Sequence, residues 1–437
     1  MRRVFFVLIF SIAITNTYSQ TILTVEEAIA AALQYNYDIQ LVRNDSSIAG
    51  VDADLAWGAF LPNLSASATR VWNKNNQTQE FSDGRKVTRE GVKTRNINPA
   101  IFLNWTLFDG LRMFATRDRL NELLVLGELN IKNQIVVTVT EVVRNYYDIV
   151  RQKQQLRAVE ELMSISEERV KLAERKVSVG LGSKPELLQA SVDLNAQKAA
   201  QLQQRTLILQ LKERLNRLTG MKLPEIYEVA DSIPIRNNIN YGEIRENLEI
   251  SNPLLQIARK NIDIANITLR ENKAGRWPVI GVTAGYNFSR QVNSVVVNPA
   301  FALASQSSGL NYGLTASVPL LNNFLIRRNI KVSQLNIKTQ QLIFENQRTL
   351  INVELSNAFK DYEYQKQALA LEEENIALAK ENVSIALERF RQGVSTFLEL
   401  REAQISFEQA NNRLIAARYN TKLAETELMR IKGDILQ

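Results

Sequence analysis

The stretch that decides the fold runs from residue 324 to residue 392 and reads FLIRRNIKVSQLNIKTQQLIFENQRTLINVELSNAFKDYEYQKQALALEEENIALAKENVSIALERFRQ. It contains neither glycine nor proline, the two residues that most readily interrupt a helix, so it predicts one continuous helix. At 1.5 Å per residue that helix would be about 100 Å long, which is more than a globular domain can use. Residues 111–179 predict a second helix of the same kind, with Gly127 as its one glycine.

Apolar residues recur along both stretches in alternating steps of three and four. In the earlier stretch the series is Leu156, Val159, Met163, Ser166, Val170, Ala173 and Val177. In the later stretch it is Ile376, Ala379, Val383, Ala386 and Phe390. A mean step of 3.5 residues is typical of a coiled-coil seam, whereas an ordinary amphipathic core helix repeats every 3.6 residues. The step and the length together favour the coiled coil.

Two further helices without glycine or proline are expected at 186–219 and 397–432. Short turns precede them, at 180–185 (GLGSKP) and at 393–396 (GVST). Because short turns force consecutive helices to run antiparallel, the chain is expected to project two long helical hairpins with these turns as their tips.

Apolar and small polar residues alternate along 97–107, 279–289 and 311–318, and more weakly along 64–72. This pattern predicts two β-hairpins, at about 64–107 and 279–319, with strands of about ten residues and polar loops at 73–96 and 291–309. A membrane β-barrel shows such alternation, with apolar side chains toward lipid, but so does a soluble sheet with one buried face. The attached long helices and the export discussed below favour the membrane sheet.

Four strands are too few to close a barrel, since eight is the practical minimum. Open sheet edges cannot persist in lipid, because their backbone groups would have no hydrogen-bond partner. The barrel is therefore expected to be shared between several copies of the chain. This argument requires an oligomer without fixing the number of subunits.

The chain reads as two copies of one plan. Pro62 corresponds to Pro278, and at a slightly shorter offset Gly180 corresponds to Gly393. Each copy is expected to open with a helix, at about 25–57 and 243–273, preceded by capping boxes that begin at Thr24 and Asn240. The expected organisation is a first repeat at 20–219, a connector at 220–242 that is rich in Pro and Asn, and a second repeat at 243–437.

Residues 1–19 resemble a secretory signal peptide. Arg2 and Arg3 give a positive start, a short apolar stretch follows, and small residues at Thr17 and Ser19 precede a cleavage site before Gln20. The apolar stretch is too short to span about 30 Å of hydrocarbon, which disfavours a membrane anchor. We expect an exported protein.

The composition excludes several kinds of site. The chain has no cysteine and no histidine, so thiol nucleophiles, disulfides, Cys/His zinc sites and Ser-His-Asp triads are excluded. Its net charge is +7, but Lys and Arg alternate with acids along the helices, which disfavours nucleic-acid binding. A glycine-rich phosphate loop is also lacking, so no nucleotide cofactor is expected. No catalytic, cofactor or metal residues are predicted.

Two pairs of motifs make the chain resemble the TolC-like outer membrane efflux protein family over nearly all of its length. The first pair is Leu107-Phe108-Asp109-Gly110 and Pro319-Leu320-Leu321-Asn322. The second pair is Arg389-Phe390-x-x-Gly393-x-x-Thr396-x-x-Glu399-Leu400-x-x-Ala403-Gln404 and Lys176-Val177-x-x-Gly180-x-x-Ser183-x-x-Glu186-Leu187-x-x-Ala190. Each motif alone is weakly specific, but both pairs in the same order form a specific set.

The resemblance implies a homotrimer in the outer membrane, with a twelve-stranded β-barrel and a helical coiled-coil barrel that extends into the periplasm. It implies a passive exit duct of a tripartite efflux or type I secretion system, which docks to a periplasmic adaptor and to an inner-membrane pump of the RND or ABC class. The alternative is a structural or adaptor coiled-coil protein of the envelope, which would leave the paired β-hairpins unexplained. An enzyme that uses carboxylates is disfavoured, because no acidic pair lies in a pocket-like context.

The tip turns correspond to the family's adaptor-docking tips. The residues concerned are Gly180, Leu181, Gly182, Gly393, Val394 and Ser395. The alternative is simple turn chemistry, since glycine tolerates positive φ.

The family also implies an acidic pore constriction at Glu399 and Glu402, which lie three residues apart and share one helix face. An alternative applies to Glu399, because Thr396 and Glu399 read as a helix-opening capping box, as do Ser183 and Glu186. Glu402 has no such alternative, so it is the stronger candidate.

One departure from the family concerns the latch that closes the tip in some members with a Tyr and an Arg. Phe390 and Ser395 occupy the corresponding positions here. Phenylalanine has no hydroxyl and serine is neutral, so we expect closure to depend on packing.

Overall fold

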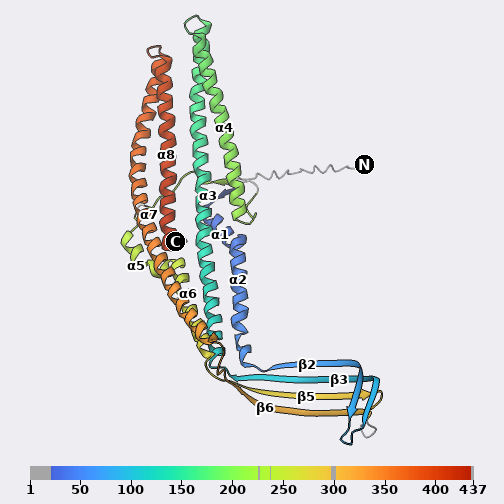
Figure 1. Cartoon of the computed structure of the whole chain (residues 1–437). Helices are drawn as coiled ribbons and strands as arrows, with labels where there is room; N and C mark the ends of the chain where they lie inside the picture. Colours follow the sequence, from blue (N-terminus) through green and yellow to red (C-terminus); the bar gives the residue numbers. More distant parts are fainter. Residues whose placement is uncertain (1–20, 225–226, 237, 297–301, 435–437) are drawn as a thin grey trace, which may run out of the picture. The chain divides into compact units, whose positions relative to one another are not determined.

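The computed structural model describes residues 21–224, 227–236, 238–296 and 302–434, so the predicted signal peptide lies outside the described residues. The described chain is mostly helical, with one four-stranded sheet and one small two-stranded sheet (Figure 1). It divides into two compact units. The first contains residues Met1–Val42, Ile131–Pro253 and Thr349–Gln437, and the second contains Arg43–Asn130 and Leu254–Arg348.

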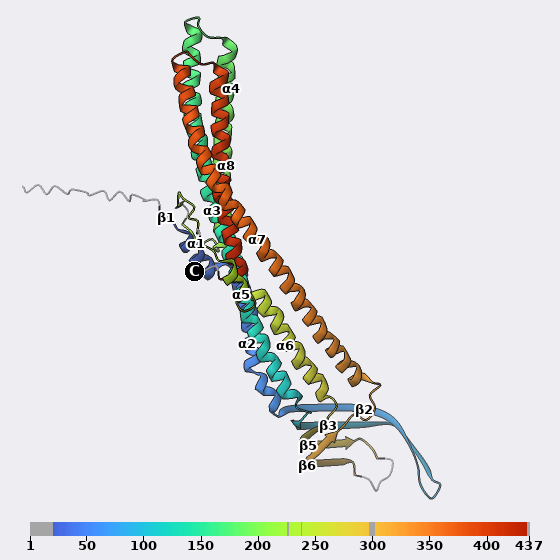
Figure 2. The ribbon, with the colours of Figure 1, turned by 90° about the vertical axis from the view of Figure 1, so that its left-hand side faces the viewer.

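The second unit contains the four-stranded antiparallel sheet, in the order β2-β3-β5-β6. Its strands are β2 (Asn63–Glu80), β3 (Lys86–Phe108), β5 (Val279–Asn293) and β6 (Ala304–Ser317), which lie side by side in Figure 2. Neither β2 nor β6 pairs on its outer side within the described chain, so both edges of the sheet are open. Every residue of β6 is exposed.

The strands are longer than the sequence predicted. Residues 73–96 were expected to form a loop, but β2 continues to Glu80 and β3 begins at Lys86, with a shift of register between Asn75 and Gln77. The prediction was wrong because polar side chains were taken as a loop signal, whereas Asn, Gln and Thr can pair across two strands that face water. The expected loop at 291–309 is likewise shortened, since β5 ends at Asn293 and β6 begins at Ala304.

In the second unit, two helices pack closely against each other at a glycine. α2 spans Tyr37–Asp54, α3 spans Arg112–Ser178, and a Cβ added at Gly127 of α3 would lie 2.8 Å from Ser46 Oγ and 3.1 Å from Ser46 Cα. Gly127 therefore lets α3 pack directly on α2. On another side of α3, Arg119 pairs with Glu271 at 3.0 Å on α6 (Pro253–Ala274).

The first unit contains the larger part of both helical hairpins, including their tips. α3 pairs with α4 (Lys184–Leu218), and α7 (Leu325–Arg391) is followed by α8 (Phe397–Lys432). Near the tips, one apolar cluster draws on all four helices, including Leu162, Ala190, Val383, Phe390, Leu400 and Phe407. The residues of the later predicted seam are buried in it, apart from the half-buried Ile376.

The opening helices are broken where the sequence predicted single helices. The expected helix at 25–57 is α1 (Val25–Tyr35) followed by α2, because Asn36 leaves the helical conformation at φ −64° and ψ 127°. Its side-chain amide donates to the carbonyl of Leu218 at 2.9 Å. The same break occurs between α5 (Tyr241–Ser251) and α6, where Asn252 donates to the carbonyl of Ile431 at 2.8 Å.

The predicted connector at 220–242 contains a strand that was not predicted from the sequence. β4 (Tyr227–Val229) pairs in parallel with β1 (Thr21–Leu23). Both strands join a core with Tyr146, whose hydroxyl donates to the carbonyl of Leu23 at 2.7 Å.

Among the residues that the structure describes, no helix is both long enough and apolar enough to cross a membrane.

Candidate functional site

The two tips are built by tight glycine turns. Gly180 adopts φ +77° and Gly393 adopts φ +75°, a left-handed conformation that favours glycine. A Cβ on Gly182 would lie 2.8 Å from Lys176 Cβ, so this position also requires glycine. Turn geometry therefore accounts for all three tip glycines.

The apolar tip residues are not explained by the turns. Leu181 is 83 % exposed and Val394 is 65 % exposed, although neither has positive φ. An exposed apolar side chain at a loop tip gains nothing from the chain's own fold. These two residues are the part of each tip that is available for a partner.

The helix after each tip begins at a side-chain cap. Ser183 Oγ accepts from the amide of Glu186 at 3.4 Å, and Thr396 Oγ1 accepts from the amide of Glu399 at 3.3 Å. At Thr24 the capping box is complete, because the side chain of Glu27 also accepts from the Thr24 amide. In the described residues, neither Glu186 nor Glu399 makes that return bond.

The two candidate pore carboxylates differ in their surroundings. Glu399 lies 3.9 Å from Arg389 in an ion pair with both side chains exposed. Glu402 is exposed and forms no ion pair within the described part of the chain. On the opposite face of α8, Leu400 and Ala403 are buried in the apolar cluster. Glu402 thus presents an uncompensated negative charge on the open face of a well-anchored helix.

A buried polar cluster near the tips was not predicted from the sequence. Arg169 of α3 is only 1 % exposed, and its guanidinium donates to Gln404 Oε1 of α8 at 2.8 Å and to Asp193 Oδ2 of α4 at 2.6 Å. Arg401 of α8 donates to the same Asp193 oxygen at 3.3 Å. Since α3 and α4 form one hairpin and α8 belongs to the other, these bonds tie the two hairpins together.

Arg169 and Asp193 each stabilise the charged form of the other. Burial lowers the pKa of Arg169, although the nearby Asp193 carboxylate opposes that effect. Burial by itself would raise the pKa of Asp193, but hydrogen bonds from Gln189 and Arg169 and the charges of Arg169 and Arg401 outweigh it and hold this pKa below its usual value. Beside the cluster lies a cavity of about 260 Å³.

Phe390 and Ser395, at the family's latch positions, do not form a polar latch. Phe390 is buried, with the Lys176 ammonium 4.0 Å from the centre of its ring. Ser395 makes one local bond, to the carbonyl of Thr396 at 3.4 Å. In the described residues, polar links between the hairpins near the tips are made by Arg169 and by Arg391 of α7, whose guanidinium donates to Glu168 Oε1 of α3 at 2.9 Å, and not by Phe390 or Ser395.

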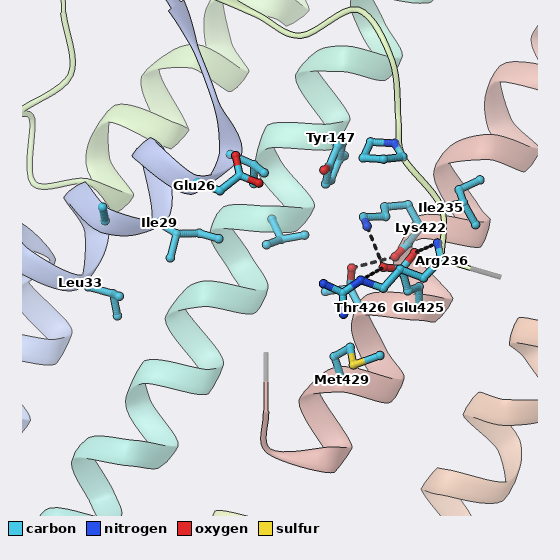
Figure 3. A pocket seen from close by; sticks show the side chains of 14 residues that line it. Glu26, Ile29, Leu33, Tyr147, Ile235, Arg236, Lys422, Glu425, Thr426 and Met429 are labelled. Carbon is cyan, nitrogen blue, oxygen red and sulfur yellow. Dashed lines mark hydrogen bonds and ion pairs between the residues drawn. The ribbon is translucent and has the colours of Figure 1, made fainter. Parts of the chain in front are cut away.

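A second cavity, of about 570 Å³, lies between α1, α3, α8 and the segment 234–236 (Figure 3). Its central group is Glu425, which accepts from Lys422 Nζ at 2.8 Å and from the amide of Arg236 at 3.1 Å. Burial raises the pKa of Tyr147, which also lines the cavity, to about 12. The Lys422 ammonium therefore balances the charge of Glu425, and the hydrogen bond from the Arg236 amide holds the segment 234–236 against α8.

The chain is similar to several known proteins and solved structures. It is 25 % identical over 380 residues to "Protein CyaE" of Bordetella pertussis, which covers 85 % of this chain and 76 % of that protein. Among solved structures, a membrane protein from Pseudomonas aeruginosa matches with a TM-score of 0.78 at 16 % identity, covering 95 % of this chain and 92 % of the other. The Campylobacter jejuni CmeC outer membrane channel matches with a TM-score of 0.77 at 15 % identity, covering 94 % and 87 %.

These structural likenesses show the fold. The outer membrane efflux protein family matches the sequence itself, in two segments at residues 28–221 and 244–434. Together the two segments contain both helical hairpins, both β-hairpins and both tips. The chain therefore belongs to the outer membrane efflux protein family.

Proposed function

We propose that this outer-membrane efflux or secretion channel is completed by three copies of the chain, which together form a membrane barrel and a periplasmic helical tunnel. The observation that carries the proposal is the open four-stranded sheet, whose edge strands β2 and β6 have no outer partner in the described chain. Lipid offers no hydrogen bonds to unpaired backbone groups, so the edges must pair with further copies. Three copies would supply twelve strands, which is enough to close a barrel.

The register of the sheet supports a membrane role, because it separates the side chains by polarity. Residues directly opposite each other in an antiparallel sheet lie on the same face. One face carries Leu64, Leu103, Ile101, Tyr286, Leu310 and Tyr312 in adjacent rows. The other face carries Ser65, Ser67, Asn104, Thr283, Asn287 and Asn311, with Phe102 as a large apolar residue among them. An apolar face toward lipid and a small polar face toward a lumen is the arrangement of a channel.

Self-association is also supported by the helices. On α7, Tyr364, Leu371, Leu378 and Ile385 recur at every seventh residue and are between 52 % and 64 % exposed. On α4, Leu202 and Leu209 have the same spacing and are about as exposed. Heptad-spaced apolar residues on an open helix face require a partner helix. A neighbouring copy supplies one, and repetition of this contact would close a tube.

The tips and the carboxylates then acquire roles. Leu181 and Val394 would contact a periplasmic adaptor, which connects the tunnel to an inner-membrane RND or ABC transporter. Glu402, repeated in each copy, would form an acidic ring that attracts cations at the tunnel mouth. The duct itself would be passive, with the pump as the source of energy.

Planar-bilayer recording tests this function. The purified protein should insert and conduct with a preference for cations. Glu402→Ala should reduce that preference by several-fold and change the conductance, because it removes one charge from each subunit at the proposed constriction. The matched control is Glu174→Ala, which removes an exposed carboxylate of α3 that forms no ion pair with any described residue and should leave the selectivity unchanged.

Two outcomes contradict different parts of the proposal. A protein that never inserts or conducts would argue against the channel. Unchanged selectivity in Glu402→Ala, with normal insertion, would remove Glu402 from the constriction and leave the channel intact.

A further inference from the structure

A cluster of basic side chains occupies one face of the sheet, at the end away from the helices. It consists of Arg70 and Lys74 of β2, Lys93 and Arg95 of β3, and Arg290 of β5. The register places Lys74 opposite Lys93, and it places Arg70 and Arg290 on either side of Ile97. All five side chains are exposed, and none forms an ion pair within the described residues.

This cluster is on the apolar face. Ile97, which lies between two of the arginines, is followed along the same face of β3 by Pro99, Ile101, Leu103 and Trp105. In the rows from Lys74 to Leu64, this face carries no carboxylate on any of the four strands. The opposite face of the same rows carries no charged side chain at all. The basic residues therefore continue the face that the proposed function turns toward lipid.

The position of the cluster along the strands matches a lipid boundary. From Trp105 to Arg95 the strand extends about 33 Å, which corresponds to about 25 Å of depth at the tilt of a membrane strand. That depth is the height of the apolar band of an outer-membrane barrel. Arg95 thus lies where the hydrocarbon ends, and Arg70 and Arg290 lie one row nearer to the helices, about 5 Å deeper, from where their long side chains can reach the boundary.

The local geometry favours an anion at this level. Like charges directly opposite each other in a sheet are destabilising, so Lys74 and Lys93 repel each other unless a counter-charge lies between them. The guanidinium of Arg70 lies 4.8 Å from the ring centre of Trp72, an aromatic residue at the depth where aromatic girdles meet head groups. Arginine also matches the oxygens of a phosphate with two parallel hydrogen bonds.

We propose that this surface, formed by Arg70, Lys74, Lys93, Arg95 and Arg290, binds the phosphate groups of an anionic lipid in the outer leaflet. The proposal rests on the proposed function, since it needs the apolar face of the sheet to face lipid. A lipid is favoured over a soluble acidic protein because the cluster is continuous with the apolar band. A lipid with a phosphorylated head group fills both regions at once, with its chains on the band and its phosphates on the cations.

Native mass spectrometry of the full oligomer in mild detergent tests the proposal. The probe is a glycolipid with two phosphates, compared with the same lipid after removal of both phosphates. The phosphorylated lipid should bind more tightly, and the difference should shrink at high salt. Arg70→Gln/Arg95→Gln/Arg290→Gln should weaken binding about a hundredfold at low salt, because each cation near an anionic surface is worth about fivefold.

Two further variants make the result specific. The triple arginine-to-lysine variant at the same positions keeps the charge and should retain most of the affinity. The matched control Arg85→Gln/Lys86→Gln/Arg89→Gln removes three cations at the β2–β3 turn, two of which have acidic neighbours, and should leave binding within about twofold. Inorganic phosphate at the same concentration should not displace the lipid.

The outcomes separate this inference from the proposed function. Equal binding of the two lipids, or an undiminished affinity in the glutamine variant, overturns the phosphate site. Displacement of the lipid by inorganic phosphate alone would mean that a free anion and not a lipid is bound, and it also overturns the proposal. A protein that enters no vesicle of any composition would instead contradict the membrane channel itself.

Discussion

At the scale of single residues, Arg169 is the most deeply buried charged side chain in the described helices. It is almost fully buried, and its two hydrogen-bonded partners come from different hairpins. Removing one partner of a buried ion pair leaves the other charge without compensation, which costs more than the pair itself contributes. Such a residue fixes the position of α8 against α3 and α4 more precisely than apolar contacts would.

We predict that Arg169→Ala lowers the free energy of unfolding by about 3 kcal/mol. Chemical denaturation followed by circular dichroism measures the change. The control Arg205→Ala breaks an exposed pair with Glu160 and should cost less than about 1 kcal/mol. Equal effects of the two substitutions would mean that burial of the Arg169 cluster does not matter.

The same cluster predicts a pH dependence. The pKa of Asp193 is lowered in the folded protein, so its contribution to stability is present above the ordinary aspartate pKa of about 3.9 and is lost as the pH falls through the folded value. Wild type should therefore lose stability in acid more steeply than Asp193→Asn.

At the scale of elements, the long helix α3 depends on its one glycine. At an exposed position inside a helix, replacing glycine by alanine would raise the free energy of unfolding by up to about 1 kcal/mol. At Gly127 the added Cβ would meet backbone and side-chain atoms of Ser46, at 3.1 Å and 2.8 Å. We predict that Gly127→Ala lowers the free energy of unfolding by about 1–3 kcal/mol, because α2 must move away from α3.

A double-mutant cycle checks the cause. Ser46→Gly removes the side-chain part of the clash, so Gly127→Ala should cost less in that background. The variant Gly50→Ala is a control, since its Cβ would lie at an ordinary 3.8 Å from Leu124. An equal cost of Gly127→Ala in both backgrounds would exclude the contact with the Ser46 side chain as its source.

The elements that the sequence predicted well are those with long, uninterrupted patterns. The range of α8 coincides with the predicted 397–432, because no breaker lies inside it and Gly433 follows it with φ +77°. The breaks at Asn36 and Asn252 were missed. Both have local signals, because Asn36 Oδ1 accepts from the amide of Ile39 and Pro253 disfavours helical backbone at Asn252, but each asparagine side chain also donates to a distant carbonyl. Here those carbonyls belong to Leu218 and Ile431, far away in the sequence.

The candidate site was predictable only in part. The tip glycines and the caps follow from local turn chemistry, which is written in a few adjacent residues. The Arg169 cluster is not, because its members come from α3, α4 and α8 and resemble solvated charges in the sequence. The roles of the tips and of Glu402 stay predictions, since they depend on partners and on further copies.

At the scale of the whole molecule, the two halves contain the same long-range contact between a glycine and a backbone carbonyl. Gly220 lies against the carbonyl of Tyr35, and Gly433 lies against the carbonyl of Ser251 in the same manner. Each glycine follows the return helix of its hairpin, next to the asparagine break of the opening helix. A duplication of one ancestral unit would produce this agreement, and the duplication stays a prediction.

The number of copies can be read from a covalent test of the sheet edges. In a closed barrel, β6 of one copy pairs with β2 of the next. Each neighbouring pair in the order β2-β3-β5-β6 is antiparallel, so β2 and β6 point in opposite directions and this contact between copies is also antiparallel. The chain has no cysteine, so introduced thiols report this contact alone. Ser67→Cys combined in turn with Gly309→Cys, Asn311→Cys or Gly313→Cys scans three registers on one face.

We predict that one of these pairs forms disulfides between chains without a cross-linker, and that denaturing gels show a band of three chains and nothing larger. Three is the limit because a ring of three closes on itself, while an open assembly would give a ladder that continues. Ser67→Cys alone should stay monomeric on the same gel, since two β2 strands do not meet. A continuing ladder, or a limit at another number, would contradict the trimer, and an absence of cross-links at every register would contradict the shared barrel.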